Sequence, residues 1–546
     1  MAHITIRYRT RRVRLAYPPF SDRDTRSLSA GNVLAEHAPD GFADVRIPAL
    51  GETLAQSVYL SGLLTPPALC SGLGRCGLCR VRFLADPPLP LAVEREALSH
   101  HDLDTGWRLA CRHAPEEGMH VLIPALGVPE QAEEQSVAVH HAPGARPLAL
   151  AVDLGTTSIC WEYLARGDAA PGTPGGTMIN PQMGAGSDSM SRIAYASTSE
   201  GAAALRRLVL DGLARVREGC GEGCVAANPA MTAILLGNSV SGLACAPYRL
   251  DYKGGVTEIL PGLFPVWIPP QVSPFIGGDV SAGYAAITLD PCAPRPEFPF
   301  LLADLGTNGE CLLALDPQTA LAASMPLGPA LEGINLSFGT NARPGAVTGY
   351  SLTPQGLAPS VMGGGAANGI TATGYLSLLR ALRSAGVLNE NGLFAPSGGA
   401  RRMPHAEPAQ TAGEPRIRLP EKMFLTASDV EEILKVKAAF TLAVSRLLAE
   451  ASLPVSRLKG VYLAGALGTH APLDALYGLG FLPPGLTAPV HLPGNTSLAG
   501  ARLFLASHAA RDTSILWAER IATLDLAGDK DFTARYAAHM TFVWQG

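Results

Sequence analysis

Four of the ten cysteines have a spacing that suits a metal centre. Cys70, Cys76 and Cys79 lie within one ten-residue stretch, and Cys111 follows thirty-two positions after the third of them. Thiolates are the ligands that zinc and iron–sulfur clusters use in proteins. Glycines at 72, 74 and 77 let the backbone fold tightly and turn N–H groups towards the sulfur atoms. The sequence therefore predicts a tight loop with three ligands and a fourth ligand from a distant segment.

The spacing favours a 2Fe–2S cluster over a structural zinc site or four core cysteines. Zinc sites usually present two close pairs of ligands, whereas a close triple and one remote cysteine resemble the plant-type ferredoxins. Five residues separate Cys70 from Cys76 where the plant-type pattern has four, which fits vertebrate-type and related variants. We expect the other six cysteines to be mostly small buried hydrophobic residues. The resemblance implies that the four thiolates ligate the cluster in a small β-grasp domain, residues 1–123.

The elements that would position these ligands flank the loop. A helix is expected over 53–64, a strand over 80–83 and a closing strand over 121–123. Basic and apolar residues alternate over 6–14, which predicts a two-sided strand rather than a targeting peptide. Residues 1–45 exceed what a minimal ferredoxin start requires, and the basic strand is a candidate for docking an electron donor.

Two further segments, 148–166 and 300–315, contain residues suited to binding phosphate. Each is an apolar strand that ends in Asp-Leu-Gly-Thr, a polar turn and a second apolar strand. The aspartates Asp153 and Asp304 are 151 residues apart, which indicates two related halves. Because a hairpin follows each glycine, turn N–H groups and hydroxyls would hold the phosphate, and each aspartate would orient the waters of Mg²⁺. The candidate nucleotide-binding residues are Gly155, Thr156, Thr157, Ser158, Gly306, Thr307, Asn308, Gly309 and Glu310.

These paired motifs resemble phosphate 1 and phosphate 2 of the acetate and sugar kinase, Hsp70 and actin (ASKHA) superfamily. The resemblance implies a two-lobed actin-like ATPase with α/β and α+β character, in which ATP and Mg²⁺ bind between the halves 148–299 and 300–546. Gly465 and Ala466 resemble the adenosine motif, although a buried strand with a glycine turn explains them as well. Gly328, Glu332 and Gly333 are further candidates for contact with nucleotide or metal.

Narrower matches resemble the reductive activators of corrinoid proteins. They are Asn180-Pro-Gln, Gly186-Ser-Asp188-Ser-Met-Ser-Arg192-Ile, Leu-Gly-Asn238-Ser, Gly277-Gly-Asp279-Val, Val436-Lys437-Ala-Ala, Gly494-Asn495-Thr496, Ala-Gly500-Ala and Asp-Lys-Asp531-Phe-Thr. Structural alternatives stay open for several of them. Asp188 and Arg192 suit a solvated helical ion pair, Lys437 suits a snorkelling side chain on a helix over 427–450, and Asn238 and Asp279 suit turn caps.

The resemblance implies that one electron passes from the cluster to a Co(II) corrinoid, giving Co(I), with ATP binding and hydrolysis as the coupled process. It also implies a corrinoid protein of a methyltransferase system as partner, an upstream low-potential donor and a homodimer. Longer relatives have an extra module before the kinase-like part. Here only the linker 124–147 is available, so we expect that module to be missing.

Three other classes of protein remain as alternatives. An activator of a radical dehydratase such as 2-hydroxyacyl-CoA dehydratase would resemble this superfamily, but such activators hold a 4Fe–4S cluster at a subunit interface. A small-molecule kinase with a fused ferredoxin needs an acidic base at its substrate pocket, and the sequence does not identify one. An Hsp70-like binding module needs a peptide-binding domain, and about forty-six residues follow Gly500.

Composition excludes further classes. With 42 basic and 47 acidic residues the net charge is −5, which excludes a nucleic-acid binder held by bulk charge. A hydrophobic content of 47% and a charged content of 16% argue against a disordered chain. The uncharged stretches 224–248 and 259–278 contain Asn, Ser and Pro, so we expect buried segments of a cytoplasmic protein rather than membrane helices.

Overall fold

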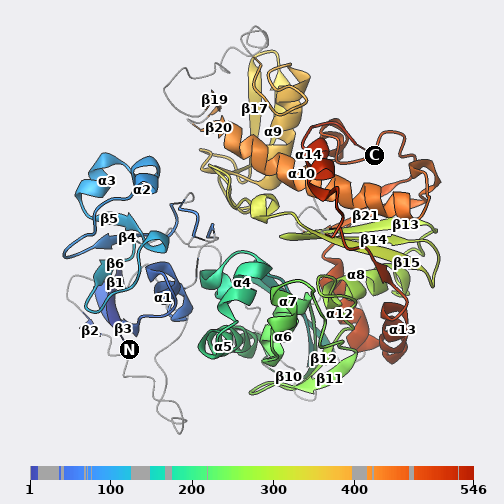
Figure 1. Ribbon diagram of the computed structural model, residues 1–546, viewed down its shortest axis with the longest axis horizontal. Helices are drawn as coiled ribbons and strands as arrows, with labels where there is room; N and C mark the ends of the chain where they lie inside the picture. Colours follow the sequence, from blue (N-terminus) through green and yellow to red (C-terminus); the bar gives the residue numbers. More distant parts are fainter. Residues whose placement is uncertain are drawn as a thin grey trace. The chain divides into compact units, whose positions relative to one another are not determined.

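Three six-stranded β-sheets organise the part of the chain that the structure describes, and two smaller sheets accompany them (Figure 1). This computed structural model divides the chain into two compact units. One unit comprises Met1–Gly223, Ala230–Asp251 and Thr257–Val266, and the other comprises Cys224–Pro229, Tyr252–Val256 and Trp267–Gly546. The described residues are 2–9, 36–37, 42–64, 66, 69–70, 72–74, 77–124, 148–165, 175–217, 219–395, 415–420, 423–465, 472–526 and 528–545.

The first sheet has the strand order β2-β3-β1-β6-β4-β5 and forms the cysteine-bearing module. Its strands are β1 (His3–Arg9), β2 (Glu36–His37), β3 (Phe42–Pro48), β4 (Arg80–Phe83), β5 (Trp107–Leu109) and β6 (His120–Leu122). The helices are α1 (Leu54–Leu60), α2 (Ala92–Ala97) and α3 (His100–Asp104), with a 3₁₀ turn η1 (Ala110–Arg112).

Strand β1 confirms the two-sided pattern, because Ile4, Ile6 and Tyr8 are buried in the module core. It pairs antiparallel with β3, and Arg7 forms an ion pair with Asp44 at 2.7 Å. The N-terminal strand is thus part of the module's sheet and not an addition to it. The prediction that the basic alternation continues to residue 14 lies outside the described residues.

Helix α1 begins where the sequence predicts and ends earlier. Thr53 caps it by accepting a hydrogen bond from the N–H of Gln56, whose side chain bonds back to the cap. The helix ends at Leu60 because Gly62 adopts a left-handed φ of +78°, which a continuing helix does not permit. The last expected turn, up to residue 64, is therefore a loop that leads to Cys70.

The second sheet has the order β11-β12-β10-β7-β8-β9, and it contains the first predicted hairpin. Its strands are β7 (Leu148–Leu154), β8 (Ser158–Ala165), β9 (Gly175–Ile179), β10 (Cys220–Ala227), β11 (Val256–Ile259) and β12 (Pro265–Ile268). The helical elements near it in the sequence are η2 (Pro181–Ala185), α4 (Ser189–Tyr195), α5 (Ser199–Val216), α6 (Pro229–Leu236) and α7 (Ser241–Ala244).

The 3₁₀ turn η2 packs against helix α1 of the cysteine-bearing module, within the same unit. Met183 is fully buried in that module's hydrophobic core. Gly184 is required there, because a Cβ at this position would lie 2.9 Å from the Cβ of Tyr59. The segment that follows β9 therefore contributes a side chain to the core of the cysteine-bearing module.

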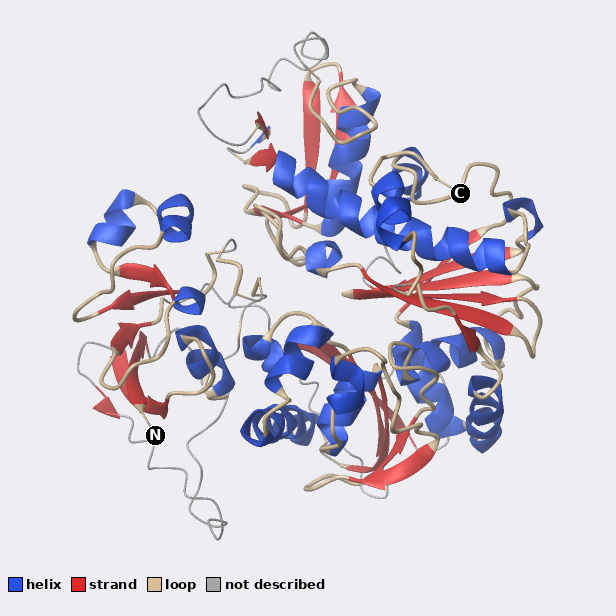
Figure 2. Cartoon of the chain, in the orientation of Figure 1, coloured by secondary structure: helices blue, strands red, loops and turns tan. Residues whose placement is uncertain are grey.

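The third sheet has the order β22-β21-β13-β14-β15-β23 and contains the second predicted hairpin. Figure 2 shows helices on both of its faces. Phe300 and Leu302 pack with Val280 of α8, whereas Leu301 and Ala303 belong to the core that includes α10. The strands are β13 (Phe300–Leu305), β14 (Asn308–Ala314), β15 (Ala320–Pro326), β21 (Gly460–Gly465), β22 (Val490–Gly494) and β23 (Ala522–Thr523). The helices are α8 (Gly278–Thr288), α10 (Ala427–Glu450), α12 (Thr496–Ala506), α13 (His508–Ala518) and α14 (Phe532–His539).

The remaining elements belong to the second unit. They are η3 (Pro329–Glu332), β16 (Ala346–Thr353), β17 (Gly356–Val361), β18 (Gly369–Ile370), α9 (Ala372–Ser384), β19 (Arg416–Arg418), β20 (Phe424–Thr426), η6 (Val455–Arg457) and α11 (Leu473–Gly478).

Both hairpins are confirmed as related structures. In each, the strand that ends in Asp-Leu pairs antiparallel with the next strand, and a third strand adds antiparallel to the second.

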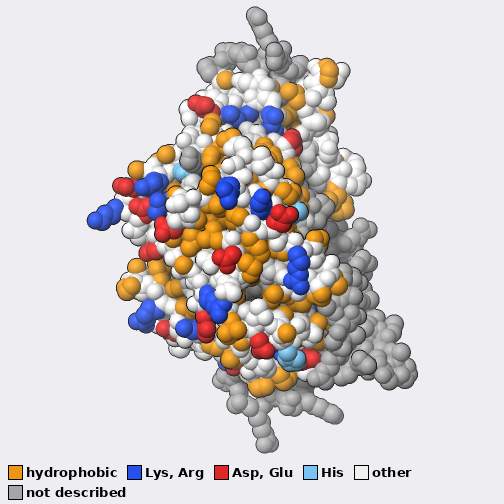
Figure 3. Space-filling view, turned by 90° about the vertical axis from the view of Figure 1, so that its right-hand side faces the viewer, with side chains coloured by type: hydrophobic (Ala, Val, Ile, Leu, Met, Phe, Trp, Pro, Cys, Tyr) orange, Lys and Arg blue, Asp and Glu red, His pale blue; other side chains and the backbone are white. Residues whose placement is uncertain are grey.

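Over the described residues no helix has the length and apolar character needed to cross a membrane. On the face drawn in Figure 3, acidic and basic side chains are interspersed with hydrophobic ones, in keeping with the small net charge.

Lys437 and most of the scattered cysteines do not lie where the sequence predicts. Lys437 does not snorkel to solvent: its side chain is fully buried, and its ammonium donates to the carbonyl oxygens of His539 and Val543. Among the six scattered cysteines only Cys224 and Cys311 are buried, and Cys245 and Cys292 are exposed.

Candidate functional site

Three of the four predicted cluster ligands lie in the described residues, and the fourth, Cys76, lies outside them. Cys70 and Cys79 are buried and Cys111 is partly buried. A hydrogen bond with the Cys79 thiol lowers the pKa of the Cys111 thiol, and the Arg112 guanidinium acts in the same direction. The nearby Cys70 thiol acts in the opposite direction and raises the pKa of Cys111. The fold thus brings the remote cysteine to the loop, as predicted.

Three glycines of the cysteine loop have left-handed backbone conformations. Gly72, Gly74 and Gly77 have φ values of +84°, +78° and +66°. A Cβ at Gly72 or Gly77 would meet nothing within 4 Å. These positions therefore favour glycine because of their backbone conformation and not because a side chain would lack room. The Gly74 N–H also lowers the pKa of the Cys111 thiol, so a backbone donor reaches this sulfur.

These residues fit an iron–sulfur cluster by the chemistry of their donors. Soft thiolates converge from a loop and a distant turn, and a backbone N–H reaches one sulfur. In the described part of the chain no group of three His, Cys, Asp or Glu side chains meets the geometry of a metal site, and Cys76 is not in that part. The set of four ligands therefore stays a prediction.

The first predicted phosphate loop follows β7. Asp153 is half-buried near the end of this strand, Thr156 and Thr157 are buried, and Ser158 is exposed. A Cβ at Gly155 would lie 2.7 Å from the carbonyl oxygen of Ser158, so the tight turn requires glycine here.

Two residues outside the loop hold its backbone. The Nδ2 of Asn180 donates to the carbonyl oxygen of Gly155 at 2.8 Å, and the N–H of Asn180 donates to that of Thr157 at 2.8 Å. Arg192 is fully buried, and its guanidinium donates to the carbonyl oxygen of Thr156 and to Gln182. The prediction that Arg192 forms a solvated ion pair is therefore wrong. Asp188 caps helix α4 by accepting a hydrogen bond from the Ser191 N–H.

The second predicted phosphate loop is bound to the turn that contains Glu332. The Oγ1 of Thr307 donates to Oε1 of Glu332 at 2.8 Å, and the N–H of Gly328 donates to the carbonyl oxygen of Thr307 at 3.0 Å. Gly328 and Gly333 have φ values of +77° and +76°, which favour glycine. Gly306 donates from its N–H to the carbonyl oxygen of Asn308 at 3.1 Å, which closes the turn. The structure brings these predicted residues together.

Three carboxylates gather near this loop on the face of the sheet that α8 covers. Asp304 and Glu310 are directly paired across β13 and β14, and Asp279 lies in the first turn of α8. Burial raises the pKa of Glu310 well above its ordinary value, and the charges of Asp279 and Asp304 add to this effect. Asp279 is the member that the sequence left open as a turn cap. It does accept from the Val280 N–H at 2.8 Å, and it is also close enough for its charge to raise the pKa of Glu310.

Gly465 lies beside Asp304. Strands β13 and β21 pair in parallel with Leu305 opposite Gly465. Gly465 has a φ of +76°, and a Cβ there would lie 2.2 Å from Oδ1 of Asp304. This glycine therefore leaves room for a carboxylate. Its predicted contact with adenosine stays untested, and Ala466 lies outside the described residues.

Other motif residues have structural roles in helix packing, helix capping and a turn. Gly500 of α12 approaches α8 so closely that a Cβ would lie 2.0 Å from the carbonyl oxygen of Ala282. Asn495 caps α12 by accepting from the Leu498 N–H at 2.8 Å. The N–H of Asn238 donates to the carbonyl oxygen of Ala233 at the end of α6, as expected for a turn.

Comparison with protein-family models covers most of the chain. The RACo middle region matches residues 148–291, and the model described as the C-terminal domain of RACo, the ASKHA domain, matches residues 299–546. The solved structure of a reductive activator for a corrinoid, iron–sulfur protein aligns with 90% of this chain and 96% of its own, with a TM-score of 0.63 and 20% identity. This likeness shows the fold, and the expected mixed α/β class with an actin-like ASKHA domain is confirmed.

Curated relatives point to the same family. A corrinoid activation enzyme, RamQ of Eubacterium limosum, is 28% identical over 72% of this chain and 70% of its own length. A Co(II) methylated amine-specific corrinoid protein reductase of Methanosarcina barkeri is 28% identical over 51% of this chain and about half (52%) of its own. A component of the Na⁺-translocating NADH-quinone reductase of Chlamydia trachomatis is 37% identical over 62 residues, 11% of this chain and 14% of its own. The chain belongs to the family of corrinoid reductive activators that carry a C-terminal ASKHA domain.

Proposed function

We propose that this chain transfers one electron from an N-terminal 2Fe–2S cluster to a Co(II) corrinoid bound in a partner protein, and that ATP binding and hydrolysis drive this transfer. The observation that carries the proposal is the presence of Cys70, Cys79 and Cys111 in one module on the same chain as a RACo-type ASKHA domain. The names of the two corrinoid-related relatives agree with this substrate.

The cysteines would hold the cluster, which supplies a one-electron carrier of low potential, about −400 mV in plant-type ferredoxins. The electron balance is simple: the cluster is oxidised by one electron, and the cobalt changes from Co(II) to Co(I). An upstream one-electron donor must then reduce the cluster again.

Reduction of Co(II) is uphill from an ordinary ferredoxin, so an energy source must bias it. ATP can do this only if nucleotide and partner bind two conformations of the protein with different affinity. Thr156, Thr157, Thr307 and Glu332 are placed in or against the turns that would contact the phosphates. Hydrolysis after the transfer would release the partner and prevent the electron from returning.

The acidic group around Asp304 supports a role for Mg²⁺. Hard oxygen ligands suit this ion, which usually keeps several waters and binds one or two carboxylates directly. Asp304, Asp279 and Glu310 offer such ligands beside the second phosphate loop, and Asp153 would act from the first. These carboxylates would orient the metal-bound waters and the water that attacks the terminal phosphate.

We include in the proposal a corrinoid protein of a methyltransferase system as the partner, because one relative is named for a methylated amine-specific corrinoid protein. A homodimer and a cytoplasmic location are further parts of it. Light scattering of the purified protein tests the dimer directly.

The test is anaerobic reduction of a Co(II) corrinoid protein with titanium(III) citrate as the electron source. Absorption of Co(I) should appear with ATP and Mg²⁺ and should not appear without ATP. Asp304→Asn should abolish the ATP effect, whereas the control Asp512→Asn, at an exposed position of α13, should leave it intact. Equal Co(I) formation with and without ATP would show that the coupling is wrong.

A further inference from the structure

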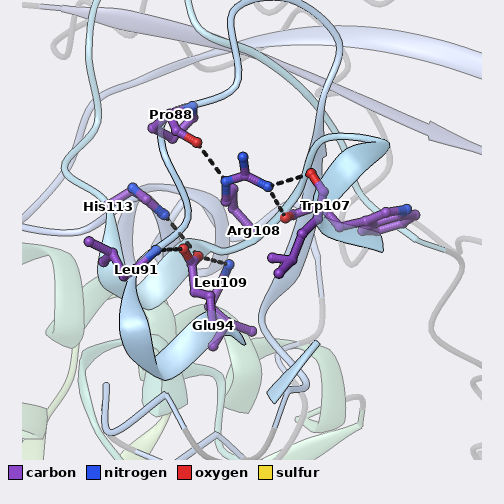
Figure 4. Close-up of polar contacts among 8 residues, drawn as sticks. Pro88, Leu91, Glu94, Trp107, Arg108, Leu109 and His113 are labelled. Carbon is purple, nitrogen blue, oxygen red and sulfur yellow. Dashed lines mark hydrogen bonds and ion pairs between the residues drawn. The ribbon is translucent and has the colours of Figure 1, made fainter. Parts of the chain in front are cut away.

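The carboxylate of Glu94 is fully buried in the cysteine-bearing module, where it accepts three hydrogen bonds (Figure 4). Its Oε2 accepts from the N–H of Leu91 at 2.8 Å. Its Oε1 accepts from the N–H of Leu109 at 2.7 Å and lies 2.9 Å from Nε2 of His113. Because a carboxylate only accepts, Nε2 of His113 carries the hydrogen of that bond.

Two of these partners, Leu109 and His113, flank Cys111 in the sequence. Leu109 ends strand β5 two residues before the cysteine, and His113 follows it by two residues, after the 3₁₀ turn η1. One oxygen atom of Glu94 therefore fixes both ends of the short segment that presents the remote ligand. The bond to Leu91 is a helix cap within α2, but the bonds to Leu109 and His113 serve no element of that helix.

Other contacts hold the same segment against the cysteine loop. The N–H of Ala110 donates to the carbonyl oxygen of Cys79 at 3.0 Å, and Nη1 of Arg112 donates to that of Gly72 at 3.0 Å. The carbonyl oxygen of His113 accepts from the N–H of Leu54 at 2.7 Å, which connects the segment to α1. A displacement of this segment would therefore change the position of Cys111 relative to the loop.

Arg108 fixes the backbone on the other side of Leu109. Its guanidinium is almost fully buried and donates to the carbonyl oxygens of Pro88, Leu103 and Trp107 at 2.6–2.9 Å. Among the bonds drawn in Figure 4, those of Glu94 are the ones that connect an acidic side chain directly to the segment of Cys111.

We infer that Glu94 is a positioning residue for Cys111, and that its negative charge lowers the midpoint potential of the bound cluster. This inference rests on the proposed function, because it requires a cluster on the four cysteines. Groups beyond the direct ligands orient those ligands, and their loss typically costs about 10–100-fold in metal affinity. Net charge and hydrogen bonding around a cluster set its potential. A buried anion near the cluster opposes the added electron, so the reduced cluster becomes a stronger donor.

Two variants separate the effect of the charge of Glu94 from the effect of its side-chain length. Glu94→Gln removes the charge and keeps the length, and it places an N–H₂ group where an acceptor is needed. Glu94→Asp keeps the charge but is one methylene shorter, so it does not span Leu91 and Leu109 together. Glu96→Gln is the matched control, because it makes the same charge change at an exposed position of α2.

The measurements are the visible and electron paramagnetic resonance spectra, the midpoint potential by redox titration, and the rate of bleaching with an excess of an iron chelator. Glu94→Gln should give a more positive potential than Glu96→Gln and about tenfold faster bleaching. Glu94→Asp should bleach faster with a potential close to that of the unaltered protein.

The outcomes distinguish this inference from the proposed function. If the unaltered protein takes up no cluster after anaerobic iron and sulfide loading, the proposed function fails. If the unaltered protein and Glu96→Gln hold a cluster, and Glu94→Gln has the same potential and bleaching rate as Glu96→Gln, the inference about Glu94 is overturned. Faster bleaching of Glu94→Asp with an unchanged potential supports it even if Glu94→Gln does not fold.

Discussion

Gly465 lies so close to Asp304 that one added methyl group tests the second half of the proposed ATP site. In Gly465→Ala the new Cβ would lie 2.2 Å from Oδ1 of Asp304 and 2.9 Å from the backbone nitrogen of Leu305. The carboxylate can rotate away, but the backbone of β13 cannot, because it pairs with strands on both sides. The substitution must therefore displace the aspartate, the strand, or both.

The cost has two parts. A residue with a side chain at a φ of +76° costs about 1–2 kcal/mol in backbone strain. Overpacking in a well-filled region adds about 1–3 kcal/mol. We therefore expect the variant to be destabilised by about 2–5 kcal/mol. Because a displacement of about 1 Å at a catalytic group can cost about 100-fold in rate, ATP hydrolysis should fall by about that factor.

Gly386→Ala separates the two parts. Gly386 follows α9 with a φ of +70°, and a Cβ there would meet nothing within 4 Å. This control carries the backbone strain without the contact to Asp304. Urea unfolding and steady-state phosphate release are measured for both variants. Equal loss of stability and equal hydrolysis in the two would refute the argument, because the contact with Asp304 would then have no effect.

The remaining predictions concern buried charges. Burial lowers the pKa of Lys437 from 10.5 to about 8, so the unfolded state binds more protons between these pH values. The free energy of unfolding should therefore gain about 3 kcal/mol from this residue as pH rises from 8 to 10.5, and urea unfolding of Lys437→Met should lack that gain. Arg192→Met should lose about 3 kcal/mol of stability and bind ATP more weakly by calorimetry, because buried carbonyl oxygens lose their donor. Chelation of Mg²⁺ should abolish ATP hydrolysis, because the carboxylates of Asp279, Asp304 and Glu310 would otherwise repel the phosphates.

The two substitutions have matched controls. Lys459→Met and Arg217→Met change exposed residues of the same types. They should leave the free energy of unfolding and the affinity for ATP unaltered. An identical pH dependence of unfolding for Lys437→Met and the unaltered protein would contradict the first prediction. Unchanged ATP affinity in Arg192→Met would contradict the second. Hydrolysis that continues in excess chelator, with the visible absorption preserved, would contradict the third.

Local patterns in the sequence predicted the local structure well. The two Asp-Leu-Gly-Thr segments form hairpins, and α10 spans Ala427–Glu450 as expected. These features depend on residues that are close in the chain: strand alternation, glycine at a tight turn, and a Thr426 cap that accepts from the Asp429 N–H.

Features that depend on tertiary burial were not predictable. The four-residue spacing of Asp188 and Arg192 suits a solvated ion pair equally well, and only the packing of η2 and the first phosphate loop around Arg192 excludes it. Lys437 lies on a helix that the sequence predicts, but the segment that covers its ammonium is a hundred residues away. Gly465 and Asp304 meet through a parallel strand pairing across more than 150 residues.

Two buried glutamates show why residue type alone does not assign a role. Glu94 accepts hydrogen bonds from three N–H donors, which stabilise its charged form and hold a nearby ligand segment. Glu310 instead lies near two other carboxylates, and burial together with their charges raises its pKa. A donor-rich environment makes a carboxylate a fixed structural support, whereas an acidic environment favours uptake of a proton or a cation. The sequence indicated Glu310 through its place in a phosphate motif and gave no signal for Glu94, because its partners come from a strand end and a turn some 15 and 19 residues further on.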